Sequence, residues 1–142
     1  METEIGIHAS PEKIWSILMD VKKYPEWNPF VRSVTGKLEE NQKIKVVVQP
    51  VGSKAMTFEP RVIRLNPNRE FRWQGSLFIK GLFDGQHIFE LTDLGRGKTI
   101  FSHREEFKGL LVSPILKRIH EGTLQGFEKM NQALKERAEA LD

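Results

Sequence analysis

The stretch that decides the fold is PILKRIHEGTLQGFEKMNQALKERAEAL, which spans Pro114–Leu141. Its apolar residues recur at steps of three and four, and this spacing predicts one long helix with a single apolar face. Ser113 before Pro114 predicts an N-cap followed by proline at the first helical position. A helix of this length rises about 40 Å, so it is long enough to cover one face of a sheet.

Two glycines lie inside this predicted helix. Gly122 and Gly126 each cost about 1 kcal/mol relative to alanine in a helix interior, and they lie four residues apart, roughly on one side. One interpretation is a close approach between helix and sheet, or a local kink. The other is that the missing side chains leave room for a molecule bound beneath the helix. The sequence leaves both open.

The chain before this helix reads largely as strands. Ser10, Pro11 and Glu12 predict the start of a first short helix, and Tyr24–Pro29 predicts a second helix or turn. The period of the apolar residues then changes to two. Because short turns separate the strands, they must be antiparallel, and the long helix is the element that can cover their buried face. The predicted strands are Glu2–His8, Val31–Glu39, Lys43–Gln49, Met56–Leu65, Arg69–Leu77, Leu82–Thr92 and Lys98–Lys108.

Composition limits the possible functions. A chain of 142 residues predicts one domain over residues 1–142. It contains no cysteine, which excludes disulfides and thiolate chemistry. The net charge is +3, but lysine and arginine alternate with acids and form no basic run, so we expect no nucleic-acid partner. The N-terminus lacks the pattern of a signal peptide and no stretch is long enough to span a membrane. We therefore expect a soluble cytoplasmic protein.

Several motifs resemble those of a known superfamily. SPEKIW (Ser10–Trp15), YPEWNPF (Tyr24–Phe30), GLFDGQHIF (Gly81–Phe89) and FSHREEFKGLL (Phe101–Leu111) together resemble the START-like (SRPBCC) superfamily. The chain is most similar to its polyketide cyclase/dehydrase-like branch. The resemblance covers essentially the whole chain and implies the α+β helix-grip fold, in which one strand, two helices, six strands and a long helix follow each other. A curved seven-stranded antiparallel sheet then wraps the C-terminal helix around an apolar cavity. Members bind lipids, plant hormones or polyketides, and a minority catalyse cyclisation or dehydration.

Strand parity predicts which side chains face that cavity, since alternate residues of a strand point to opposite faces. The faces richer in aromatic residues should point inward, and they carry His87, His103 and Glu105 with them. Histidine titrates near neutrality, and apolar surroundings favour the protonated form of a carboxyl group, so these three residues are candidates for proton transfer. The alternative is that they bond to one another and to the backbone. The predicted ligand-binding residues are Phe71, Trp73, Leu77, Phe83, His87, Phe89, Phe101, His103, Glu105, Ile119, Thr123 and Phe127.

Other kinds of site have weaker support. The four histidines, at positions 8, 87, 103 and 120, lack metal-ligand spacing, so we expect no metal. No nucleophile elbow, P-loop or dinucleotide fingerprint occurs, and no cofactor is expected. Leu77–Gly85 is unusually apolar for a connection between strands. It could pack as core, open as a rim for an apolar ligand with Gly75, Gly81 and Gly85 as hinges, or touch a membrane surface through residues such as Lys80.

Three hypotheses for the function follow. The first is binding or transport of a small hydrophobic molecule, lipid-like or polyketide-like, in a cavity between the sheet and the C-terminal helix. The second is an enzyme of the cyclase or dehydratase type that uses His87, His103 and Glu105 for proton transfer. The third is a protein–protein interaction module. The sequence identifies neither the ligand nor the oligomeric state.

Overall fold

The computed structural model describes residues 1–76, 84–109 and 112–140. The described segments contain a first strand, three short helices, seven further strands and a long final helix, in that order. In chain order the elements are β1 (Glu2–Ile7), α1 (Pro11–Met19), the 3-10 helix η1 (Val21–Lys23), α2 (Tyr24–Trp27), β2 (Val31–Thr35), β3 (Lys45–Val48), β4 (Met56–Phe58), β5 (Arg61–Asn66), β6 (Glu70–Ser76), β7 (Asp84–Gly95), β8 (Lys98–Lys108) and α3 (Val112–Ala140).

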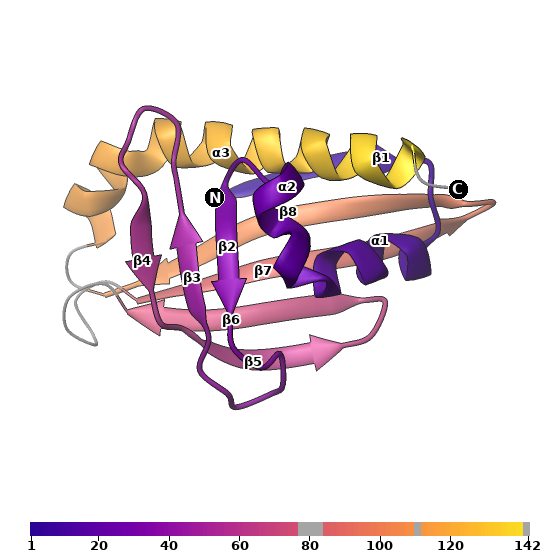
Figure 1. Ribbon diagram of the computed structural model, residues 1–142. Coiled ribbons are helices and arrows are strands. Elements are labelled where there is room, and N and C mark those ends of the chain that lie inside the picture. The colour runs from indigo at the N-terminus through magenta and orange to yellow at the C-terminus, as the bar shows by residue number, and fades with distance from the viewer. Residues whose placement is uncertain (77–83, 110–111, 141–142) are drawn as a thin grey trace.

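The described strands form two antiparallel sheets. Five of them make one sheet in the order β1-β8-β7-β6-β5, and the other three make a second sheet in the order β2-β3-β4. Figure 1 shows the strands of the smaller sheet running across those of the larger one, with α1 and α2 beside them and α3 along one side of both. The space enclosed by the two sheets and α3 holds the core.

The prediction of seven strands in one sheet is wrong in detail, since the segment expected as one strand over Met56–Leu65 is two. It breaks at Glu59 and Pro60, because proline has no N–H for a sheet ladder and restricts the residue before it. Met56–Phe58 pairs with β3, whereas Arg61–Asn66 pairs with β6. The break passes the chain from one sheet to the other, and an isolated bridge between Lys43 and Arg61 spans the junction.

The long helix is the predicted one, although it begins at Val112 and therefore places Ser113 inside its first turn. Its two glycines allow close packing. A Cβ at Gly122 would lie 2.5 Å from the carbonyl oxygen of Val51, and the Gly122 carbonyl accepts a 3.0 Å hydrogen bond from the Val51 N–H. A Cβ at Gly126 would collide with the ring of Phe30. The first interpretation of these glycines is therefore correct, and the space beneath them is filled.

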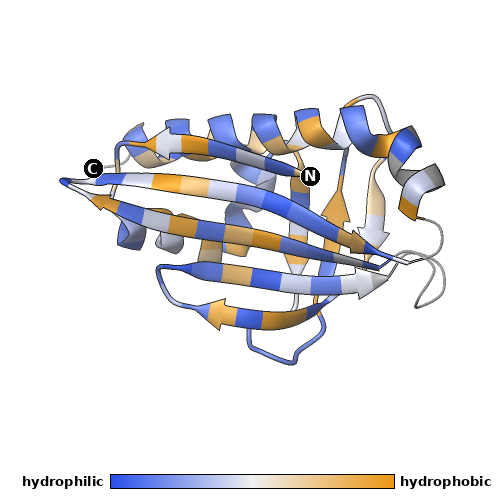
Figure 2. Cartoon of the chain, turned by 180° about the vertical axis from the view of Figure 1, so that it is seen from behind, coloured by the Kyte–Doolittle hydropathy of each residue, from blue (hydrophilic) through white to orange (hydrophobic). Residues whose placement is uncertain are grey.

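The core follows the predicted alternation along the strands, and Figure 2 shows it as bands of contrasting hydropathy on the large sheet. The largest fully buried side chains include Tyr24, Phe71, Phe89, Phe101 and Phe127. The first helix begins as predicted, since the Ser10 hydroxyl accepts a hydrogen bond from the Lys13 N–H at 3.2 Å and Pro11 opens the helix. Within the described residues, no helix is long and apolar enough to cross a membrane.

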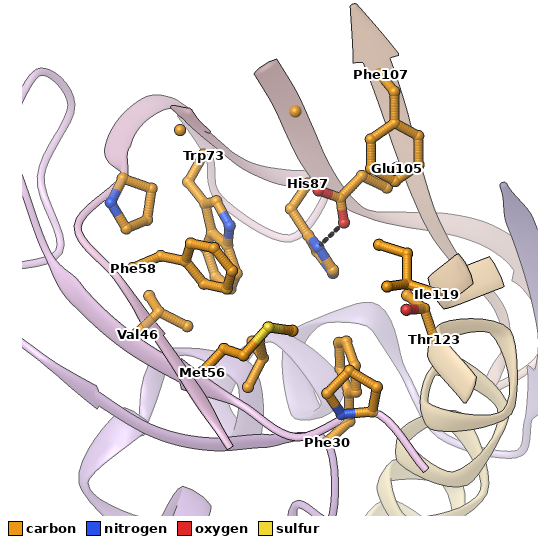
Figure 3. Close-up of a pocket in the computed structure, with 15 residues that line it drawn as sticks. Phe30, Val46, Met56, Phe58, Trp73, His87, Glu105, Phe107, Ile119 and Thr123 are labelled. Carbon is orange, nitrogen blue, oxygen red and sulfur yellow. Dashed lines mark hydrogen bonds and ion pairs between the residues drawn. The ribbon is translucent and has the colours of Figure 1, made fainter. Parts of the chain in front are cut away.

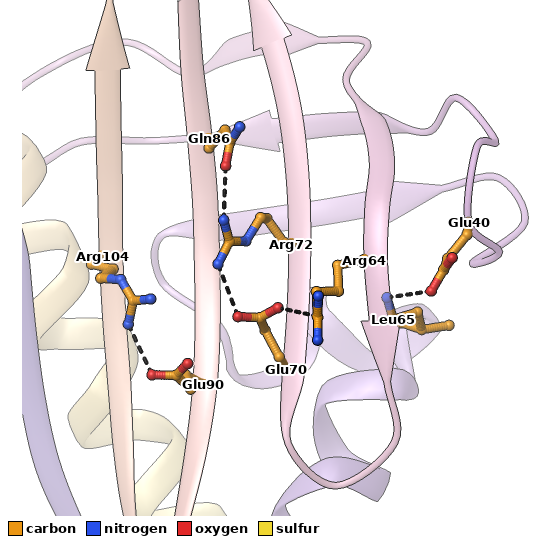
Figure 4. Close-up of polar contacts among 8 residues, drawn as sticks. All are labelled: Glu40, Arg64, Leu65, Glu70, Arg72, Gln86, Glu90 and Arg104. Atoms are coloured by element: carbon orange, nitrogen blue, oxygen red, sulfur yellow. Dashed lines mark hydrogen bonds and ion pairs between the residues drawn. The ribbon is translucent and has the colours of Figure 1, made fainter.

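The outer face of the large sheet is polar, and ion pairs connect its strands. Glu70 lies between two arginines, 2.7 Å from the Nε of Arg64 and 2.9 Å from Arg72, and Arg104 contacts Glu90 at 3.0 Å. Figure 4 shows these contacts on strands β5 to β8. Glu70 is itself buried among its partners, whereas the side chain of Arg64 is 59% exposed, so this face is polar and partly solvated, and the apolar core lies on the other face.

Candidate ligand cavity

A cavity of about 120 Å³ lies between the two sheets, next to the first half of α3. Apolar cavities of about 150 Å³ can hold a benzene molecule, so this space suits one ring. Figure 3 shows Trp73 and Phe58 toward one side of the cavity, Ile119 and Thr123 toward the other, and His87 with Glu105 between them. The residues that line it are Phe30, Val46, Val48, Pro50, Met56, Phe58, Pro60, Trp73, Gly75, Gly85, His87, Glu105, Phe107, Ile119 and Thr123.

Two glycines stand in the wall of this cavity. Gly75 and Gly85 stand directly opposite each other on β6 and β7, and both line the cavity. The inner face of the sheet therefore has no side chain at two adjacent positions. A Cβ at Gly85 would lie 2.6 Å from Oε1 of Glu105, so the carboxylate extends over the position where that side chain would stand. Both glycines lie within the strands that flank the connection, and Gly81, the third predicted hinge, lies outside the described residues.

The polar part of the cavity wall is a pair on neighbouring strands. His87 on β7 and Glu105 on β8 are direct cross-strand partners, and the Nδ1 of His87 lies 2.7 Å from the Oε2 of Glu105. The side chain of His87 is 4% exposed and that of Glu105 is 20% exposed. Glu105 therefore stands at the wall, with His87 buried behind it.

Behind this pair, polar side chains continue into the core. The Nε2 of His87 lies 2.7 Å from the Nε2 of His103, and the Nδ1 of His103 lies 3.0 Å from the Oδ1 of Asn131 on α3. Asn131 also contacts the Thr3 hydroxyl at 2.8 Å, which lies 2.9 Å from the backbone carbonyl of His103. We call Glu105, His87, His103, Asn131 and Thr3 the polar chain. It joins the cavity wall to the first strand.

The ring of His103 is fully buried and stacks on Phe127 at 4.0 Å between ring centres. Burial lowers the pKa of His103 well below its ordinary value of 6.5, and repulsion from His87 acts in the same direction. Hydrogen bonds to Asn131 and to the backbone of Phe127 oppose this shift. His103 is therefore neutral near neutral pH.

This lowered pKa predicts how stability depends on pH. Below pH 6.5 the unfolded chain protonates His103 while the folded chain does not, so the unfolded state binds more protons and stability falls with falling pH. The contribution of neutral His103 to the free energy of unfolding is complete above pH 6.5. It is lost as the pH drops toward the folded-state pKa, at up to about 1.4 kcal/mol per pH unit. Urea denaturation across that range should show a weaker pH dependence for His103→Gln than for the natural chain. Equal slopes would contradict the assignment.

The structure separates the predicted ligand-binding residues into three groups. Five of them line the cavity: Trp73, His87, Glu105, Ile119 and Thr123. Five others, Phe71, Phe89, Phe101, His103 and Phe127, are at most 1% exposed and belong to the core, so the cavity does not extend to them. Leu77 and Phe83 lie outside the described residues, as does the rest of the apolar connection at 77–83.

Four of the residues that the sequence reasoning missed belong to the smaller sheet. Val46 and Val48 on β3 and Met56 and Phe58 on β4 point into the cavity, and each pair has the spacing of two that could have identified it. Phe30 also lines the cavity, and its ring packs edge-on against Phe127 at 5.3 Å. It was missed because nothing in the YPEWNPF motif shows which way its aromatic side chains point.

Among the described residues, no group of three or more metal-ligating side chains gathers. The histidine nitrogens of the polar chain instead contact protein partners. The chemistry available at the wall is hydrogen bonding and proton transfer by His87 and Glu105, with the Thr123 hydroxyl nearby.

Comparison with known proteins places this geometry in context. Residues 1–139 match the profile of the family described as polyketide cyclase / dehydrase and lipid transport. No curated protein sequence matches the chain significantly.

Solved structures of related shape have low sequence identity. The Zhui aromatase/cyclase of Streptomyces sp. R1128 is 17% identical, with a TM-score of 0.74 over 98% of this chain and 92% of that one. A START superfamily protein from Mycobacterium smegmatis is 22% identical, with a TM-score of 0.71 over 100% and 98%. Norcoclaurine synthase from Thalictrum flavum, in complex with dopamine and hydroxybenzaldehyde, is 14% identical, with a TM-score of 0.75 over 100% and 87%. At these identities the likeness concerns the fold, and it confirms the predicted helix grip.

Proposed function

Because the chain belongs to the family of polyketide cyclases, dehydrases and lipid-transport proteins, we propose that it binds a small, mainly apolar molecule in the cavity between its two sheets and α3. The observation that carries this proposal is the lining. Eight of the fifteen lining residues are large aliphatic or aromatic side chains: Phe30, Val46, Val48, Met56, Phe58, Trp73, Phe107 and Ile119.

The size and polarity of the cavity define what it holds. About 120 Å³ accommodates one ring of a ligand, and apolar pockets with a few polar groups are typical binding sites. The polar side chains of the lining are His87, Glu105 and Thr123. We expect the ligand to place its apolar ring against Trp73 and Met56 and one polar group toward Glu105.

Binding is tested with toluene as a probe and a variant that fills the cavity. Met56 lines the cavity, so Met56→Trp should occupy the space and weaken toluene binding by about tenfold or more, since 1.4 kcal/mol corresponds to that factor. Titration followed by the methyl NMR signals of Ile119 measures the affinity. The structural reason is steric, because the larger side chain occupies the volume of one ring.

The matched control is Thr57→Trp, which places the same residue at the next position of β4. Thr57 is exposed, and its side chain points to the opposite face of the strand, so toluene affinity should remain within about twofold of the natural chain. If the natural chain does not shift on addition of toluene, or if both variants bind equally well, the cavity is not a binding site.

Proton-transfer catalysis is a second candidate function, and the His87–Glu105 pair at the wall favours it. A histidine and a carboxylate 2.7 Å apart can remove a proton from carbon and return it to oxygen, which are the steps of enolisation in a cyclase or dehydratase. The test is deuterium exchange at the α-carbons of cyclohexanone in heavy water. Exchange above the rate without protein supports catalysis, whereas exchange at that rate leaves binding as the only proposed function.

A further inference from the structure

The hydrogens of the polar chain can be assigned from its inner end, because a backbone carbonyl only accepts. The Thr3 hydroxyl lies 2.9 Å from the His103 carbonyl, so the hydroxyl donates to it. The oxygen of Thr3 can then only accept from Asn131, 2.8 Å away. Asn131 must therefore turn its Nδ2 toward Thr3 and its Oδ1 toward His103.

This orientation fixes the tautomer of His103. An amide oxygen only accepts, so the Nδ1 of His103, 3.0 Å from Oδ1 of Asn131, carries the hydrogen. The ring is neutral because burial lowers its pKa, and its Nε2 therefore has a free lone pair. That lone pair accepts from the Nε2 of His87 at 2.7 Å, so the hydrogen of this bond belongs to His87.

One hydrogen then remains for the contact at the cavity wall. Nδ1 of His87 and Oε2 of Glu105 are 2.7 Å apart, and a hydrogen bond at that distance needs one proton between them. The pair is either imidazolium with carboxylate or imidazole with carboxylic acid, and both arrangements have zero net charge. Glu105 and Thr123 both line the cavity, and Oε2 is the carboxylate oxygen that contacts His87, so Oε1 and the Thr123 hydroxyl are the groups that a ligand would meet.

We propose that Thr3 and Asn131 are positioning residues that set the direction of the polar chain, so that His87 and Glu105 share a single proton at the cavity wall. Such a wall is neutral and offers Oε1 of Glu105 as an acceptor. It therefore suits a ring that carries a neutral hydroxyl group, and it disfavours carboxylates and ammonium groups. The preference for a ligand rests on the proposed binding function, whereas the position of the proton does not.

The direction of the chain can be reversed by Asn131→Asp. A carboxylate beside His103 favours a second proton on that ring. The proton on Nε2 of His87 then moves to Nε2 of His103, and the shared proton moves to Nδ1 of His87, which leaves Glu105 fully ionised. No proton is gained or lost. The ring ¹⁵N chemical shifts distinguish protonated from bare nitrogens, so NMR should show Nδ1–H His103 in the natural chain and doubly protonated His103 in the variant.

Ligand binding gives a second measurement. Phenol and toluene have nearly the same shape, and their affinity ratio reports the bond to the hydroxyl. In either arrangement the His87–Glu105 pair changes from zero net charge to one uncompensated negative charge. Bonds to charged acceptors are stronger than bonds to neutral ones, so Asn131→Asp should raise the preference for phenol about 3- to 10-fold and leave toluene affinity unchanged. A variant that only damages the structure would weaken the affinities for phenol and for toluene alike. The control is Gln132→Glu, which adds the same charge to the exposed face of α3 and should change neither the shifts nor the ratio.

If Asn131→Asp does not fold, Thr3→Val provides a second test of how the orientation of Asn131 affects His103. Without the hydroxyl, Asn131 loses the partner that fixes its orientation, and the ring ¹⁵N shifts of His103 should move toward those of the other tautomer, to the extent that the hydrogen bond to the backbone of Phe127 permits. The proposal is overturned if His103 of the natural chain carries its hydrogen on Nε2, or if the ring shifts of the variants match those of the natural chain. A chain that shows the expected tautomers but does not bind toluene would contradict the proposed function and leave the proton assignment intact.

Discussion

Replacing Phe127 by alanine is expected to lower the free energy of unfolding by about 3–5 kcal/mol. Phe127 is fully buried, and its ring stacks on His103 with an interplanar angle of 12° and meets His87 edge-on at 5.2 Å. Truncation leaves a cavity beneath the polar chain. Domains of this kind have a total stability of about 5–15 kcal/mol, so the loss is a large share. Urea denaturation with an unchanged m-value would measure it.

The control for this prediction is Phe58→Ala. Phe58 lines the ligand cavity and is only partly buried, so its removal enlarges a space that is already open and should cost clearly less than removal of Phe127. If the two variants lose equal stability, Phe127 is not the packing centre between α3 and the large sheet.

The second large effect is expected at Gly122, where alanine should destabilise the chain by about 1–3 kcal/mol. In most helices the same change stabilises by about 1 kcal/mol. Here the new methyl group would lie 2.5 Å from the Val51 carbonyl oxygen, a backbone atom that cannot turn aside. Either α3 or the turn between β3 and β4 must move, and the hydrogen bond from Val51 is strained.

Thermal and urea unfolding of Gly122→Ala test this change of sign. Ala133→Gly provides the scale, since it should cost about 1 kcal/mol as an ordinary helix position of α3. A more stable Gly122→Ala variant would mean that the close contact with Val51 is easily relaxed. The same variant should also alter toluene affinity, because Ile119 and Thr123 on either side of Gly122 line the cavity.

The sequence predicted the element types well, because they depend on local patterns. Spacings of three and four identified α3, and Ser10 with Pro11 identified the start of α1. The prediction of a single strand over Met56–Leu65 failed at Pro60. The period of two continues through this segment, but proline has no backbone N–H, and the strand is divided there. Which sheet each half joins depends on long-range pairing, and such pairing is not encoded in the alternation of a single strand.

The candidate site was predicted in part for a similar reason. Parity placed His87 and Glu105 on inward faces, but only the register shows that they stand opposite each other and that His103 lies one step deeper. Parity also cannot separate core from cavity. Phe71 and Trp73 share a face, yet only Trp73 lines the cavity, whereas Phe71 is fully buried in the core.

The facing glycines also limit how this binding site can change during evolution. Position 85 determines the shape of the cavity and, through the 2.6 Å approach to Oε1 of Glu105, the place of its acidic group. Any residue larger than glycine there must both reduce the volume and displace the carboxylate. A lineage that adapts to a smaller ligand through position 85 would therefore alter its hydrogen-bonding preference in the same step, whereas changes at Met56 or Val48 would alter the shape alone.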